Sequence, residues 1–96
     1  MPLTLCVLLW AHPGQDDALT AYEDTVLALL PDHGSRLVSR VRRTAGGDDD
    51  PLEVQVIDLP SREALAAYMA DPRRTALEAS REAAIARTRV LEVTAR

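Results

Sequence analysis

The segment Leu3 to Trp10 (LTLCVLLW) constrains the fold most, because every residue in it except Thr4 is apolar. The segment shows no helical period, and it is far too short for a membrane-spanning helix. Such a run is typical of a strand that is buried on both faces. Only Met1 and Pro2 precede it, so it lacks the basic region and cleavage site of a secretory leader. We therefore expect a central sheet strand, in a cytoplasmic protein that has no membrane partner.

The rest of the chain alternates between helical and extended patterns. Apolar residues three and four apart predict a helix from Asp16 to Leu30, capped by Asp16 or Asp17, with Glu23 on its outer side. The later elements are expected, in order, as strand 35–44, turn 45–51, strand 52–59, helices starting at Ser61 and at Asp71-Pro72, and strand 87–94. Arg74 and Glu78 are expected on the outer side of the last helix, as a minor ion pair.

This order of elements predicts a single α+β domain over residues 1–96. Two right-handed β-α-β halves that share one sheet give the ferredoxin-like βαββαβ arrangement. The four-stranded sheet is then antiparallel, and both helical segments cover the same face.

The face of the sheet without helices is expected to be apolar. In the first strand, Cys6, Leu8 and Trp10 alternate with Leu5, Val7 and their neighbours, so both faces carry apolar side chains. A monomer rarely exposes a large apolar patch. We therefore expect a homodimer in which two copies pack together through this open sheet face.

Charge and composition exclude several classes of partner. The net charge is −4, whereas a nucleic-acid-binding domain needs a basic face. An RNA-binding protein of this topology also needs aromatic residues on its middle strands, where only Trp10 is available. A lone cysteine, Cys6, cannot build a disulfide or a metal cluster, and His12 and His33 have no patterned carboxylate partners. We expect no nucleic acid, no metal and no cofactor.

Several short motifs resemble the dimeric α+β-barrel superfamily between Tyr22 and Val93. They are Tyr22-Glu23, HGSR at 33–36, VIDLPSREALAAYMADP at 56–72 and RVLEV at 89–93. Within the superfamily, the chain looks most like a small bacterial family of unknown function, with departures at Ser35, Leu59 and Asp71. The resemblance implies a dimeric α+β barrel of ferredoxin-like domains. It implies less about activity, because the superfamily includes cofactor-free monooxygenases, muconolactone-type isomerases, haem-degrading enzymes and proteins without an assigned role.

Six side chains are candidates for a ligand pocket beside the sheet: Trp10, Tyr22, His33, Arg36, Arg40 and Tyr68. Each tyrosine lies on an apolar helical stripe, so it is either a core residue or a hydroxyl that points into a cleft. His33 is either a residue at a helix end or a general base beside Arg36.

Arg36, Arg40 and Arg42 are expected to project from one side of the second strand. Together with Glu53 and Gln55 they form either a solvated sheet edge or a polar wall of a cavity between sheet and partner. In the second case an arginine would hold a carboxylate or an enolate, and Trp10 would lie at the end of the cavity.

Three functions stay open on the sequence alone. The first is a homodimer that binds a small organic molecule, and the second is a cofactor-free monooxygenase or isomerase. The third is a dimerisation module without a ligand. No phosphate-binding loop, nucleophile elbow or zinc-binding helix motif decides among them.

Overall fold

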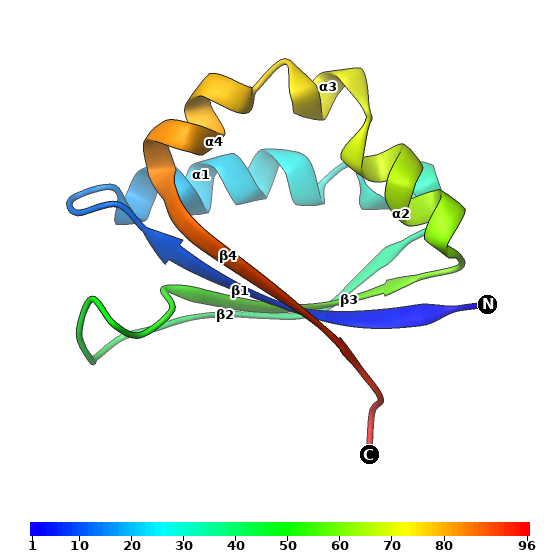
Figure 1. Ribbon diagram of the computed structural model, residues 1–96, viewed down its shortest axis with the longest axis horizontal. Coiled ribbons are helices and arrows are strands. Elements are labelled where there is room, and N and C mark those ends of the chain that lie inside the picture. The colour runs from blue at the N-terminus through cyan, green and yellow to red at the C-terminus, as the bar shows by residue number, and fades with distance from the viewer.

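The apolar segment at the start of the chain forms β1 (Leu3–Ala11), which lies inside the sheet as expected. In the computed structural model, which describes all 96 residues, the strand order is β2-β3-β1-β4 and all neighbours are antiparallel (Figure 1). The other elements are α1 (Asp16–Leu27), the 3-10 helix η1 (Leu30–His33), β2 (Arg36–Arg42), β3 (Glu53–Leu59), α2 (Arg62–Met69), α3 (Pro72–Thr75), α4 (Glu78–Ala84) and β4 (Ile85–Val93).

Helices α1, α2, α3 and α4 all cover the same face of the sheet (Figure 1), so the predicted ferredoxin-like α+β fold is confirmed. The element ends differ from the predicted ones by a few residues, as helix and strand ends commonly do. The single helix expected after Asp71-Pro72 is divided into α3 and α4. No helix is long and apolar enough to cross a membrane.

Two of the expected helix caps are present, and the third is not. The side chains of Ser61 and Asp71 accept hydrogen bonds from backbone N–H groups in the first turns of α2 and α3. The expectation that Asp16 or Asp17 caps α1 was wrong, because Gln15 occupies that position without a side-chain hydrogen bond. Both aspartates lie in the first turn, where a negative charge still favours the helix.

Two aliphatic clusters fill the space between helices and sheet. The first contains Leu9, Leu19, Tyr22, Val26, Leu52, Ala84 and Ile85. The second contains Leu5, Leu27, Leu30, Ile57, Leu59 and Tyr68. Each cluster holds one ring only, so branched aliphatic side chains make up nearly the whole core.

A bulge in β2 corrects the expected placement of its arginines. The register with β3 shifts between Leu37 and Ser39, which leaves Val38 as an extra residue. Arg36 therefore pairs with Asp58 on the open face of the sheet, whereas Arg40 and Arg42 lie on the helix-covered face. The prediction that all three arginines share one side was wrong, because one inserted residue reverses the alternation.

The polar residues of β3 are also placed differently from the expectation. Glu53 and Gln55 are almost fully buried and face the helices, not solvent or a partner. Val54 and Val56 alternate with them and face the open side. Glu23 is buried too, on the inner side of α1, so its predicted outer position was wrong.

Arg40 compensates the buried charge of Glu53 and ties β2 to α1. Its guanidinium donates to both carboxylate oxygens of Glu53, at 2.7 and 3.0 Å, and it also binds Asp24 and the backbone oxygen of Thr20. Burial alone would raise the pKa of Glu53. The hydrogen bonds from Arg40, Thr20 and Gln55 outweigh burial and hold that pKa below its ordinary value.

Arg40→Ala is expected to lower the free energy of unfolding by about 3–5 kcal/mol, because it leaves the buried carboxylate of Glu53 without its cation. Arg42→Ala is the matched control, since Arg42 also joins β2 to α1 but pairs with the exposed Asp17. Its expected cost is below about 1 kcal/mol. Urea unfolding of both variants measures the difference, and equal costs would contradict the role of Arg40.

Candidate functional site

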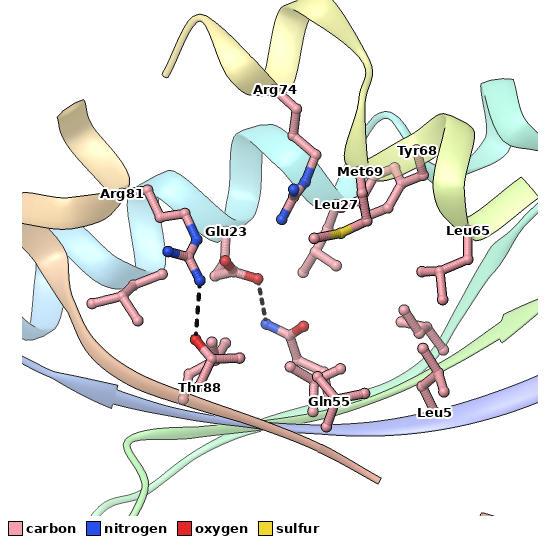
Figure 2. A pocket seen from close by; sticks show the side chains of 15 residues that line it. Leu5, Glu23, Leu27, Gln55, Leu65, Tyr68, Met69, Arg74, Arg81 and Thr88 are labelled. Atoms are coloured by element: carbon pink, nitrogen blue, oxygen red, sulfur yellow. Dashed lines mark hydrogen bonds between the residues drawn. The ribbon is translucent and has the colours of Figure 1, made fainter. Parts of the chain in front are cut away.

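A cavity of about 200 Å³ lies between the helices and the sheet, lined by members of both aliphatic clusters. Strands form its floor and helices form its roof (Figure 2). Its lining residues are mostly apolar: Leu5, Val7, Leu9, Glu23, Leu27, Gln55, Ile57, Leu65, Tyr68, Met69, Arg74, Arg81, Ile85, Thr88 and Val90. This space accommodates a single ring, since an apolar cavity of about 150 Å³ takes up benzene.

One part of the cavity is polar, where Glu23 of α1 meets Gln55 of β3 (Figure 2). Gln55 Nε2 donates to Glu23 Oε1 at 2.9 Å and to Glu53 Oε1 at 3.3 Å. Burial raises the pKa of Glu23, and the hydrogen bond from Gln55 offsets only part of that effect. When ionised, Glu23 is therefore a stronger base than an exposed carboxylate, which makes it a candidate for proton transfer.

Two arginines point into the cavity from the helical side, Arg74 of α3 and Arg81 of α4 (Figure 2). The guanidinium of Arg74 lies over the ring of Tyr68, 4.9 Å from its centroid, and its Nε is buried without a hydrogen-bond partner. Arg81 donates to Thr88 Oγ1 at 3.3 Å. A buried donor without a partner costs about 1–3 kcal/mol, so this position of Arg74 lowers the free energy of unfolding.

Tyr68 is the only one of the six predicted side chains that lines this cavity. Its hydroxyl donates to the backbone oxygen of Val26 at 2.9 Å, and its ring packs edge-on against His33. Burial raises the pKa of the Tyr68 hydroxyl, and the charge of Arg74 opposes that rise. Tyr68 is thus a neutral, fixed part of the cavity wall.

Tyr22 and His33 lie behind the cavity wall. Tyr22 is buried in the first aliphatic cluster, and burial raises the pKa of its hydroxyl. His33 Nε2 lies 2.8 Å from Asp71 Oδ2, so His33 has a carboxylate partner that sequence spacing does not reveal. Hydrogen bonds from Arg73 and His33 hold the pKa of Asp71 well below its usual range. Arg36 does not join this group, since it projects from the opposite face of the sheet.

Arg40, Arg36 and Trp10 stay outside the cavity. Arg40 is held in the buried ion pair described above, and Arg36 binds the half-exposed Asp58 on the open face. Trp10 lies near the end of β1, with the guanidinium of Arg87 over its ring at 4.4 Å. No group of three metal-binding side chains gathers anywhere in the chain.

Sequence reasoning missed four of the five polar residues that line the cavity: Glu23, Arg74, Arg81 and Thr88. It named the fifth, Gln55, as part of a polar wall, but of a cavity between the sheet and a partner. Glu23 follows Leu19 by four residues and precedes Val26 by three, which places it on the apolar stripe of α1. Arg74 precedes the apolar Leu77 by three residues and Arg81 follows it by four, so a helical pattern places both arginines on the side of Leu77. The expected outer position of Arg74 was therefore wrong, and these spacings were the signal that could have shown it.

Comparison with known proteins shows the fold of the chain and no more. No family model matches the sequence, and no curated protein matches it. Solved structures do match. A Pseudomonas aeruginosa protein superposes with a TM-score of 0.79 at 15% identity, over 99% of this chain and 94% of its own.

Two further similar structures carry informative descriptions. A Bacteroides fragilis protein, described as dimeric, of unknown function and of ferredoxin-like fold, has a TM-score of 0.73 at 10% identity, over 96% of this chain and 94% of its own. A putative antibiotic biosynthesis monooxygenase from Bacteroides thetaiotaomicron has a TM-score of 0.75 at 10% identity, over 98% of this chain and 89% of its own. These likenesses confirm the ferredoxin-like fold that the sequence motifs imply.

The raised pKa of Glu23 predicts how Glu23→Gln changes stability with pH. Below the ordinary pKa of glutamate, Glu23 is protonated in both the folded and the unfolded chain. Its titration then contributes nothing to the pH dependence of the free energy of unfolding. As pH rises, the unfolded chain ionises first, so the wild type loses up to about 1.4 kcal/mol per pH unit until the folded-state pKa is reached. Glu23→Gln lacks this loss. Its stability relative to wild type is therefore expected to be higher at pH 8 than at pH 4.

Urea unfolding at both pH values measures this difference, and the exposed Glu82→Gln on α4 serves as the control. A difference between Glu23→Gln and wild type that stays constant or shrinks with rising pH would contradict the buried, proton-holding state of Glu23.

Proposed function

We propose that this chain binds a small organic molecule with a mostly apolar body in the cavity between its helices and its sheet. The observation that carries the proposal is the combination of an apolar lining with a few convergent polar groups, one of them a carboxyl group with a raised pKa. Such a combination is typical of ligand sites and uncommon in a plain core, where buried polar groups are matched internally.

The site residues of this proposal are partly those predicted from the sequence. Tyr68 and Gln55 belong to the cavity wall, and Glu23, Arg74 and Arg81 are added from the structure. Three predicted residues do not line the cavity but hold neighbouring parts of the fold in place. Tyr22 packs in the core, His33 is hydrogen-bonded to Asp71, and Arg40 forms an ion pair with Glu53. Trp10 and Arg36 have no place in it, because neither of them lines the cavity.

A second copy of the chain is the partner that we propose for the open sheet face. The face carries the apolar side chains of Cys6, Leu8, Val41, Val54, Val56, Leu91 and Val93, and also the polar ones of Thr4, Arg36, Ser39, Asp58 and Arg89. Val41 is 56% exposed, and Leu91 and Val93 are each 37% exposed. A solved structure of this fold is described as dimeric, which supports the pairing. We place the resulting homodimer in the cytoplasm.

A cofactor-free enzyme is the second candidate, and one observation favours it. The buried Glu23 carboxylate faces the cavity, where it is placed to take a proton from a bound carbon acid or phenol. Loss of that proton starts an isomerisation, and it also makes an electron-rich ring more reactive toward oxygen. A structure of this fold is described as a putative monooxygenase. Turnover of phenols and lactones, followed by oxygen uptake or isomerisation, separates this candidate from simple binding.

Small neutral ring compounds are expected to stabilise the wild-type protein. Toluene or benzyl alcohol at 100 times its dissociation constant should add about 2.7 kcal/mol. In a domain of this size the melting temperature rises by about 4–8 °C for each kcal/mol. Leu65→Phe fills part of the cavity and should lose most of this response, whereas Leu29→Phe is the matched control outside the cavity.

Thermal unfolding with and without the compounds provides the measurement. Absence of stabilisation in wild type, or an equal response in the two phenylalanine variants, would rule out this cavity as the binding site.

Val56→Arg is expected to break the homodimer, because it places a charge in the middle of the apolar open face. Light scattering should give the wild type a mass twice the 10.5 kDa of one chain, and the variant the mass of one chain. Ala67→Arg adds the same charge to the exposed surface of α2 and should stay dimeric. A monomeric wild type at micromolar concentration is the result that overturns the pairing.

A further inference from the structure

Arg74 and Arg81 bring two positive charges to the cavity, and neither has a carboxylate partner (Figure 2). Every ion pair in the structure is made by other cations. Arg81 binds the neutral hydroxyl of Thr88. The Nε of Arg74 is the one buried side-chain nitrogen or oxygen atom of the chain that has no hydrogen-bond partner.

Glu23 is the one carboxyl group that lines the cavity, and it forms no ion pair with either arginine. Its Oε1 accepts the hydrogen bond from Gln55, and a single carboxyl group faces two guanidinium groups there. The neighbouring carboxylate of Glu53 is already bound to Arg40. The cavity therefore combines an apolar lining with an excess of positive charge.

The position of Arg74 differs from that of an ordinary surface arginine. Its guanidinium packs over the ring of Tyr68, and the side chain points into the cavity (Figure 2). Nε and the adjacent terminal nitrogen of an arginine form a planar fork that matches the two oxygens of a carboxylate. The Nε of Arg74 is enclosed by the chain and has no hydrogen-bond partner in it, so the protein itself does not satisfy this guanidinium fully.

We propose that the ligand of this cavity is a small organic monocarboxylate whose apolar body is about the size of one ring. Its carboxylate binds the guanidinium of Arg74, with Arg81 as a second positive charge nearby, and its body packs against Leu27, Ile57 and Leu65. This inference rests on the proposed binding function and adds the chemical class of the ligand to it.

Benzoate, benzamide and toluene are the probes, because they share one ring and differ in the group attached to it. At pH 7 benzoate is charged and benzamide is neutral. Calorimetric titration of the wild-type protein should give benzoate a dissociation constant at least about tenfold below that of benzamide, as expected for a hydrogen-bonded charge pair. Equal affinities, or tighter binding of benzamide, would overturn the assignment of an acid ligand.

Arg74→Gln tests which residue makes the distinction. It should weaken benzoate binding to the level of benzamide and leave benzamide binding unchanged. Arg96→Gln removes the same charge from the exposed end of the chain and should behave like wild type. If circular dichroism shows that Arg74→Gln does not fold, Arg74→Lys replaces it. Arg74→Lys keeps the charge without the fork and should still weaken benzoate binding. Wild-type benzoate affinity in the folded variant would contradict the role of Arg74.

The three probes also separate this inference from the function on which it rests. If toluene and benzamide bind and benzoate binds no better, the cavity is a ligand site but its ligand is not an acid. If none of the three binds to the folded wild-type protein, both the binding function and the acid ligand are wrong.

Discussion

Gln55, in the middle of β3, donates hydrogen bonds to two buried carboxyl groups, Glu23 from α1 and Glu53 on its own strand. Arg40 of β2 completes this chain of polar groups inside an otherwise aliphatic layer. A buried carboxylate is tolerated only with such partners, so the network fixes how β2, β3 and α1 lie relative to one another. The bulge at Val38 belongs to this arrangement, because it turns Arg40 toward Glu53.

Within this network the pKa values of the two carboxyl groups are shifted in opposite directions. Glu53 has an arginine and its pKa is lowered, whereas Glu23 has an amide and its pKa is raised. Glu23 also borders the cavity, so a group that readily takes up a proton faces a space large enough for a ring. The open face of the sheet carries the Arg36–Asp58 ion pair and mostly apolar side chains elsewhere. Its apolar part suits contact with a second copy of the chain.

Much of the fold was predictable from the sequence. The run Leu3 to Trp10 identified the interior strand, and the order of the elements identified the sheet. The candidate site was less predictable. Alternation along β3 separates Glu53 and Gln55 from the valines, but it does not tell which set faces the helices. One bulged residue reversed the side on which Arg36 lies, and no spacing rule signals that bulge. Contacts such as His33 with Asp71 join residues far apart in the chain, so only the folded structure shows them.

A nuclear magnetic resonance titration of methyl-labelled protein with toluene tests whether the space between helices and sheet is a ligand site. We expect shifts at the methyl groups of Leu27, Ile57 and Leu65, and unchanged positions for those of Val41 and Val56 on the open face. Shifts confined to the open-face methyl groups, or no shifts up to saturating toluene, would contradict the proposed ligand site.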